Sequence, residues 1–288
     1  MSRQRSTGRC RRTWRLSRHV LIAAPQAVPQ WERNRLARVS ALLEADGVSK
    51  HFGGVHALRN VSLRLREGEV VGLIGPNGSG KTTFLNCVSG VFPPSAGRIT
   101  LDGRPISRRR GHTVARRGLV RTFQNIRLFG WLTALQNVEV GALGAGRARR
   151  GSSRRQALET LAELGIDRLA DRYAGTLSYG DQRRLEIARA LAAAPRFLLL
   201  DEPAAGMNEG ESAELGRAIG AIRRERGCGV LVVDHDLHLI MRICDRIVVL
   251  NEGAAIAAGA PEEVRTDPAV IAAYIGDETA NATNGGAE

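Results

Sequence analysis

One stretch of the sequence fits the phosphate-binding pattern G-x-x-x-x-G-K-[ST]: Gly75-Pro76-Asn77-Gly78-Ser79-Gly80-Lys81-Thr82-Thr83. The apolar residues 70–74 before it predict a short buried strand, and residues 82–88 after it predict the first turns of a helix. Glycines let the backbone wrap closely, so successive N–H groups and the helix N-terminus point at a phosphate. Lys81 adds a positive charge for the β- and γ-phosphates, and the Thr82 hydroxyl is a ligand for Mg²⁺. The stretch therefore predicts a site for a nucleoside triphosphate.

The composition is that of a globular protein. Of the 288 residues, 43% are hydrophobic and 25% are charged. No run approaches the roughly 20 continuous apolar residues that a membrane-spanning helix needs, so a role in a membrane process would depend on docking to a partner. The four cysteines lack C-x-x-C spacing, which predicts reduced, structural thiols in a cytosolic protein.

The net charge of +13 is concentrated near the N-terminus. Residues 1–40 hold ten Arg and one acidic residue, a charge of +9, and the remainder of the chain carries only +4. This distribution predicts no dedicated nucleic-acid surface. We interpret residues 1–40 as a disordered basic extension, one explanation being a start codon assigned too far upstream. An Arg-rich, acid-poor targeting leader is the alternative.

Hydrophobic patterns predict an α/β fold with a mainly parallel central sheet. The runs 197–200 and 229–233 are apolar without interruption, as in strands buried on both faces, and residues 209–226 between them predict a crossover helix. Residues 61–66 alternate apolar and polar side chains, which predicts a half-buried antiparallel strand. Residues 42–48 predict an edge strand.

The remaining segments complete a folded region over residues 41–277. Residues from about 125 to 190 predict a mostly helical subdomain, which contains a loop rich in Gly, Arg and Ser over 144–153. A late hairpin over 247–258 is followed by a short closing helix over 261–275. The final residues, 278–288, have the composition of a flexible tail.

A pair of carboxylates follows the apolar run 197–200. Asp201 is placed at the strand end to hold Mg²⁺, commonly through water, and Glu202 is placed to polarise the water that attacks a γ-phosphate. A second anion-binding helix start is predicted at Leu177-Ser178-Tyr179-Gly180-Asp181. Because the phosphate loop already supplies one such terminus, we expect Ser178 and Gly180 to serve a different nucleotide.

Together these motifs resemble those of the ATP-binding cassette (ABC) ATPases. The phosphate loop, Gln124, the Ser178 signature, the Asp-Glu strand end and His235 occur in that family's order and spacing over roughly residues 42–277. The resemblance implies a P-loop NTPase fold with an antiparallel β subdomain and a helical subdomain. It also implies that Phe52 stacks on adenine, that Gln124 senses Mg²⁺ and the γ-phosphate, and that His235 contacts the γ-phosphate.

The same resemblance implies a Mg²⁺-dependent ATPase that works as a head-to-tail dimer. ATP would lie between the phosphate loop of one subunit and Ser178 and Gly180 of the other, and the loop 205–208 would meet the other subunit. ATP binding would close the dimer and hydrolysis would let it open. This cycle would drive membrane partners between inward- and outward-facing states.

Finer features resemble the ATPases of branched-chain amino acid importers. They are the segments 121–129, 202–208, 234–236 and 261–276, together with Tyr179 inside the signature. The resemblance implies a peripheral subunit on the cytoplasmic face of the membrane, with two permease subunits, a second ABC ATPase subunit and an external binding protein as partners. The long basic leader departs from this pattern, as does Asp181, which replaces the commoner Gln or Glu.

Three alternatives remain open from the sequence. The same cassette could serve another cargo, such as urea, amides, or exported lipid and lipopolysaccharide. A soluble ABC ATPase associated with nucleic acid is disfavoured, because such proteins commonly carry two cassettes or a long coiled-coil insertion. A small-molecule kinase is disfavoured because the Ser178 signature has no role there.

Overall fold

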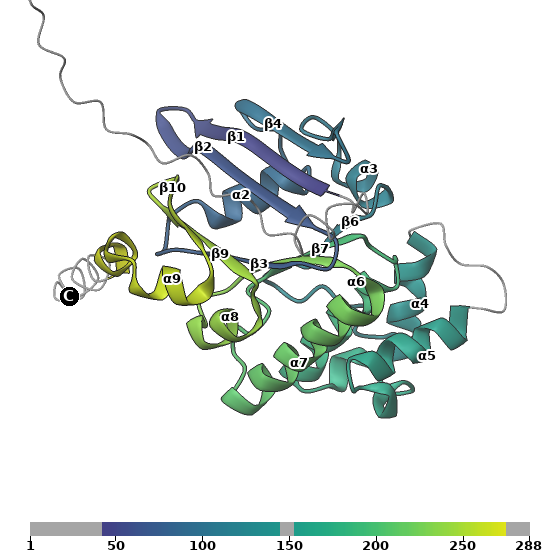
Figure 1. The fold of residues 1–288 in the computed structure, drawn as a ribbon. Coiled ribbons are helices and arrows are strands. Elements are labelled where there is room, and N and C mark those ends of the chain that lie inside the picture. Colours follow the sequence, from purple (N-terminus) through teal and green to yellow (C-terminus); the bar gives the residue numbers. More distant parts are fainter. Residues whose placement is uncertain (1–41, 145–152, 275–288) are drawn as a thin grey trace, which may run out of the picture. The chain divides into compact units, whose positions relative to one another are not determined.

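The chain between residues 42 and 259 forms two β-sheets with helices packed against them (Figure 1). The computed structural model describes residues 42–144 and 153–274. The predicted basic extension, most of the predicted loop 144–153 and the predicted tail lie outside the described residues. The strands are β1 (Leu42–Phe52), β2 (Val55–Arg66), β3 (Val70–Ile74), β4 (Ala96–Leu101), β5 (Arg104–Pro105), β6 (Leu119–Arg121), β7 (Phe197–Asp201), β8 (Gly229–Val233), β9 (Arg246–Asn251) and β10 (Ala254–Gly259). The helices are α2 (Lys81–Val88), α3 (Gly111–Arg116), α4 (Ala134–Gly144), α5 (Ser153–Glu163), α6 (Tyr179–Leu191), α7 (Glu209–Arg226), α8 (Leu237–Ile243) and α9 (Pro261–Thr266).

The smaller sheet is antiparallel where its strands pair, and its order is β2-β1-β4-β5. The predicted alternation in β2 is confirmed, since Val61, Leu63 and Leu65 are buried while the residues between them are exposed. The prediction of an edge strand over 42–48 is wrong. β1 pairs with β2 on one side and with β4 on the other, because β4 returns from a distant part of the chain to cover its second edge.

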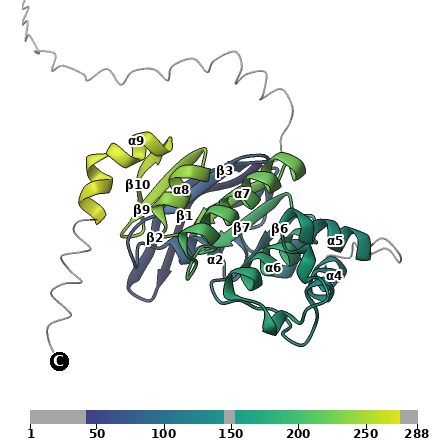
Figure 2. The ribbon, with the colours of Figure 1, turned by 90° about the horizontal axis from the view of Figure 1, so that it is seen from below.

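The larger sheet has the order β10-β9-β3-β8-β7-β6, and the strands from β9 to β6 pair in parallel. The uninterrupted apolar runs are explained by a core on each face. Leu198 and Leu200 point into one core with residues of α4 to α8, whereas Phe197 and Leu199 point into the other with residues of α2. Figure 2 shows α6, α7 and α8 over one face of this sheet. The hairpin prediction is also confirmed, since β9 and β10 pair antiparallel.

Helix α2 lies between the two sheets (Figure 1). Its buried side chains Phe84 and Leu85 share a core with Leu43 of the smaller sheet and Leu199 of the larger one. The phosphate loop, which leads into α2, is therefore anchored from both sides by buried apolar area.

The helical part of the chain contains α4, α5 and α6, and the first of them begins only at Ala134. Helix α7 covers the predicted range 209–226 and starts with a capping box between Asn208 and Glu211.

Cys87, Cys228 and Cys244 are free and buried, and burial raises their thiol pKa to about 11, 12 and 12, so they are poor nucleophiles. None of the helices in the described residues is long and apolar enough to cross a membrane.

Candidate nucleotide-binding and catalytic site

Four parts of the predicted site lie together because neighbouring parallel strands end at one edge of the larger sheet. β3 leads into the phosphate loop at Gly75, β6 leads to Gln124, β7 ends at Asp201, and β8 leads to His235. These four strands are adjacent in the order β3-β8-β7-β6. The carboxyl edge of such a sheet is where open α/β folds place their ligands.

The glycines of the phosphate loop are required by space and by backbone angle. Gly75 has φ +147° and Gly80 has φ +101°. A Cβ on Gly75 would collide with the carbonyl oxygen of Leu250, and one on Gly80 would lie 2.5 Å from the carbonyl oxygen of Ala57. The loop is thereby pressed against both the β9–β10 hairpin and β2.

Lys81, the first residue of α2, points back over the loop. Its Nζ donates hydrogen bonds to the carbonyl oxygens of Gly75 at 2.7 Å and Pro76 at 2.8 Å. The remaining predicted phosphate ligands occupy the same turn and differ in exposure: Ser79 is buried, Lys81 and Thr83 are half-buried, and Asn77, Gly78 and Thr82 are exposed. The loop and the first turn of α2 thus hold one ammonium group, two threonines and several N–H groups together.

Two hydrogen bonds fix Glu202, the predicted catalytic base. Gln124 Nε2 donates to Glu202 Oε2 at 2.7 Å, so the predicted sensor and the predicted base are in direct contact. Glu202 adopts a left-handed backbone with φ +47°, a conformation that costs a non-glycine residue about 1 kcal/mol or more. Its N–H is fixed by a hydrogen bond to the carbonyl of Val233 at 2.7 Å.

Arg121 holds Asp201 in a buried ion pair that the sequence did not predict. Arg121 Nη2 lies 2.7 Å from Asp201 Oδ2, and both side chains are only 5% exposed. Nη1 of the same arginine donates to Asn86 Oδ1 and Ser89 Oγ, at the end of α2. The pair therefore joins β6, β7 and the helix that carries the phosphate loop.

Asp234 fixes the loops that follow β7 and β8. Its buried carboxylate accepts hydrogen bonds from the N–H of Ala204 at 2.8 Å and from the N–H of Asp236 at 3.0 Å. His235 itself is 72% exposed at the side chain, and its Nδ1 lies 3.7 Å from Asp234 Oδ1. The structure thus places His235 at the solvent side of the sheet edge, next to the segment that carries Glu202.

Phe52 lies at the end of β1, with its ring edge-on to Phe92 at a centroid distance of 5.4 Å. Lys50 Nζ lies 5.0 Å from the ring centroid of Phe52 and 4.9 Å from that of Phe92. Phe52 remains 48% exposed, as a ring that stacks on a nucleobase must be.

Ser178 and Gly180 lie at the start of α6, outside the strand-end edge. Ser178 caps the helix, accepting from the N–H of Asp181 at 3.2 Å and donating to its carboxylate at 2.8 Å. A Cβ on Gly180 would lie 2.8 Å from Glu211 Oε1 at the start of α7. That Ser178 and Gly180 serve a different nucleotide from the phosphate loop stays a prediction.

Arg183, one turn into α6, makes contacts that no sequence motif indicates. The side chain is fully buried, and it donates to the carbonyls of Phe123 at 2.8 Å and Gln124 at 2.6 Å. It also donates to Glu186 at 2.9 Å and to the hydroxyl of Tyr179 at 3.1 Å. Burial raises the pKa of Glu186, and the positive charge of Arg183 offsets this only in part.

The residues predicted to bind Mg²⁺ fit that ion by their chemistry. Thr82, Gln124 and Asp201 offer only oxygen ligands, which hard cations prefer. Within residues 42–144 and 153–274, no group of three or more His, Cys, Asp or Glu side chains is arranged to hold a metal.

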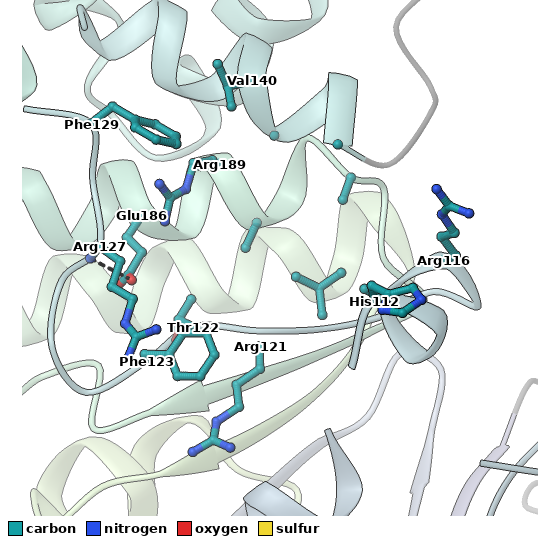
Figure 3. A pocket seen from close by; sticks show the side chains of 16 residues that line it. His112, Arg116, Arg121, Thr122, Phe123, Arg127, Phe129, Val140, Glu186 and Arg189 are labelled. Atoms are coloured by element: carbon teal, nitrogen blue, oxygen red, sulfur yellow. Dashed lines mark hydrogen bonds between the residues drawn. The ribbon is translucent and has the colours of Figure 1, made fainter. Parts of the chain in front are cut away.

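A groove of about 450 Å³ lies between the helical part and the segment that follows β6. Figure 3 shows Phe129, Val140 and Arg189 along one wall, with His112 and Arg116 at the other end. Glu186 is the acidic residue among its lining side chains. Trp131, next to this groove in sequence, is 75% exposed and packs edge-on to Phe129 at 5.9 Å.

Known proteins are similar to this chain in both sequence and fold. Residues 58–205 match the family model "ABC transporter", and residues 256–280 match "Branched-chain amino acid ATP-binding cassette transporter". The chain is 46% identical over 252 residues to the high-affinity branched-chain amino acid transport ATP-binding protein BraF of Pseudomonas aeruginosa, covering 82% of this chain and 98% of that protein. It is 39% identical to the lipopolysaccharide export system ATP-binding protein LptB of Acidithiobacillus ferridurans, over 83% and 99% of the two chains.

Solved structures agree with these relationships. An ATP-binding cassette of an ABC transporter in its ADP conformation superposes with a TM-score of 0.75 at 30% identity, covering 82% of this chain and 99% of that one. The fold and the strand-end site thus define a P-loop ATP-binding cassette. The chain belongs to the ABC transporter family of ATP-hydrolysing subunits, which confirms the resemblance seen in the sequence.

Proposed function

We propose that this chain hydrolyses ATP with Mg²⁺ to power the uptake of branched-chain or related amino acids through partner permeases. The observation that carries the catalytic part is the contact of Gln124 with Glu202 at the end of β7, at the sheet edge where β3 enters the phosphate loop. In this proposal Lys81 exchanges its backbone carbonyl acceptors for phosphate oxygens, and Phe52 stacks on adenine.

Glu202 acts as the general base for the attacking water. When the γ-phosphate arrives, Gln124 turns from Glu202 toward it, which frees the carboxylate to accept a proton. His235 contacts the γ-phosphate from the loop after β8. Thr82, Gln124 and Asp201 would hold Mg²⁺, whose charge supports the transfer by neutralising the phosphate oxygens.

The complete site needs a second subunit. Ser178 and Gly180 stand at a helix N-terminus, where N–H groups favour an anion, and we assign them to the ATP on the phosphate loop of a partner ATPase. The partner is a second copy of this chain or a related subunit. The loop 205–208 lies beside Tyr179 and would take part in the same interface.

The groove beside Phe129 is the proposed docking site for a permease segment. Arg116, Arg127 and Arg189 give its lining a positive charge, and burial lowers the pKa of Arg189 while Glu186 acts the other way. A permease segment with an apolar tip and an acidic residue would complement this lining. Leu128 in the same segment packs against the core, so a charge there would also disturb the fold. Trp131 is exposed, so Trp131→Asp tests docking alone, and unchanged association with the permeases would contradict this assignment.

The branched-chain amino acid cargo is supported by the printed functions of relatives at 42 to 46% identity and by the family model that matches residues 256–280. Lipopolysaccharide export is the second candidate, because relatives named for that process are 36 to 39% identical. We favour import because its relatives are the more similar ones. The chain would then lie on the cytoplasmic face of the membrane, with two permease subunits and an external binding protein.

Uptake of labelled leucine, isoleucine and valine tests cargo and direction together. Cells carrying chromosomal Glu202→Gln should lose uptake of one or more of these amino acids while the protein stays at normal levels. Unchanged uptake, with redundant systems excluded, would remove the amino acid assignment.

For the purified protein, Glu202→Gln should keep ATP binding, abolish turnover and trap a dimer, whereas Lys81→Ala should weaken ATP binding itself. A Glu202→Gln protein that turns ATP over normally as a monomer would refute the catalytic roles.

A further inference from the structure

Tyr179, the third residue of the stretch Leu177-Ser178-Tyr179-Gly180-Asp181, lies beside the loop 205–208. Gly206 has φ +74°, and a Cβ built on it would lie 3.3 Å from Cε1 of the Tyr179 ring. The ring therefore lies against the glycine backbone of the loop that precedes α7. Any larger residue at position 206 would have to push the ring away.

The hydroxyl of Tyr179 connects this contact to the loop around Gln124. It accepts a hydrogen bond from Arg183 Nη2 at 3.1 Å, and the same nitrogen donates to the carbonyl of Gln124 at 2.6 Å. Arg183 Nη1 donates to the carbonyl of Phe123 and to Glu186. All four N–H groups of the two terminal nitrogens thus have an acceptor, and the planar guanidinium can hold only one orientation with respect to them.

These contacts form a closed circuit that links three segments: the loop around Gln124, the start of α6, and the residues from Glu202 to Gly206. The side chain of Gln124 contacts Glu202, and its carbonyl contacts Arg183. Arg183 contacts Tyr179, whose ring lies on Gly206, four residues after Glu202. If a fully buried guanidinium left its acceptors, its charge would remain in the interior without hydrogen-bond partners. We therefore expect Arg183 to follow the backbone of Gln124 when that loop moves.

We propose that Tyr179 is a positioning residue that, together with Arg183, couples the loop around Gln124 to the loop 205–208 and to the start of α6. The inference rests on the function proposed above. A shift of the Gln124 backbone on ATP binding would rotate or translate α6 and with it Ser178, which serves the neighbouring nucleotide site. Occupancy of one ATP site would thereby set the geometry of the other, giving cooperativity between the two sites.

The test compares two variants with a matched control in the full-length protein. Tyr179→Phe removes only the hydroxyl, and Arg183→Lys keeps the charge but loses the planar fork. The control is Arg226→Lys. Arg226 makes a similar set of hydrogen bonds, to Glu163, Thr160 and the Leu191 carbonyl, and these do not involve the circuit through Gln124, Arg183 and Tyr179. Three quantities are measured: the affinity of the monomer for a fluorescent ATP analogue, the Hill coefficient of ATP hydrolysis, and ATP-dependent dimerisation in the Glu202→Gln background.

We expect both variants to bind the analogue within about twofold of the unmodified protein, since neither side chain belongs to the phosphate loop. The Hill coefficient should fall towards one, and the ATP concentration for half-dimerisation should rise about tenfold. Arg226→Lys should lower only the melting temperature. Tyr179→Phe with an unchanged Hill coefficient and unchanged dimerisation overturns the inference, as does an equal loss of cooperativity in Arg226→Lys. A Glu202→Gln protein that stays monomeric at saturating ATP contradicts the proposed function itself, and the inference with it.

Discussion

The phosphate-binding edge of the larger sheet and the start of α6 both carry residues assigned to ATP, but different forces hold them. At the sheet edge, strand pairing and glycine geometry fix the backbone, and Gly75 has no room for even one more carbon beside Leu250. At the start of α6, one buried side chain, Arg183, ties the helix to the loop around Gln124. The first arrangement is confined by backbone collisions, whereas the second depends on hydrogen bonds of one side chain, which under our proposal moves with its acceptors.

The largest expected effect comes from a substitution in the phosphate loop. Gly75→Ala places a Cβ against the Leu250 carbonyl, and no rotamer change relieves a backbone collision. We expect at least about a hundredfold loss of ATP affinity, measured by calorimetry, or a protein that does not fold. Gly78→Ala is the matched control, because nothing lies within 4 Å of its Cβ and only the strain of φ +77° remains, about 1 to 2 kcal/mol. Equal affinities in the two variants would show that the loop is not confined as described.

The second prediction concerns the side-chain link. Arg183→Met removes the charged partner of the buried Glu186 carboxylate, which keeps only the N–H of Arg127 as a donor, so the free energy of unfolding should fall by about 3 to 5 kcal/mol in urea denaturation. Adding Glu186→Leu should recover part of the loss, because it removes the uncompensated charge. A loss below about 1 kcal/mol in the single variant would mean that solvent reaches this pair.

The smallest effect lies at the loop after β8. Burial acts to raise the pKa of Asp236, but hydrogen bonds from the Leu239 N–H and the Ser212 hydroxyl outweigh it and lower the pKa below the ordinary 3.8. A carboxyl with a lowered folded-state pKa contributes stability that is present above pH 3.8 and is lost as the pH falls through the folded-state value. Asp236→Asn keeps a side chain suited to the N-cap position and should flatten this part of the pH dependence of unfolding. An unchanged slope below pH 4 would contradict the role given to Asp236.

Much of the sheet edge was predictable because its signals are local. The phosphate loop lies between a strand and a helix that each show their own pattern, and the crossover helix occupies its predicted range, residues 209–226. Strand order was less accessible, and residues 42–48 were misread as an edge strand. Their second partner, β4, lies some fifty residues further on, and nothing local marks that pairing.

The side-chain contacts of the site were not predictable from motifs. Arg121 reaches Asp201, 80 positions away in the chain, and Arg183 reaches Phe123, 60 positions away. Both arginines stand among many others in an arginine-rich sequence, and most arginines in the part of the chain that the structure describes are exposed. The one available signal was position: Arg121 directly precedes the segment containing Gln124, and Arg183 lies one turn after the signature.

The sequence by itself determined the class of protein, the phosphate loop, the carboxylates after β7 and the helix start at Ser178. Each of these depends on a few residues close together in the chain, whose spacing fixes the local backbone. Only the tertiary structure decided that Gln124 contacts Glu202, that Arg121 holds Asp201, and that Tyr179 and Arg183 join three loops. Those contacts depend on which strands are neighbours in the sheet and on which side chains are buried between helices, and these are properties of the whole packed chain.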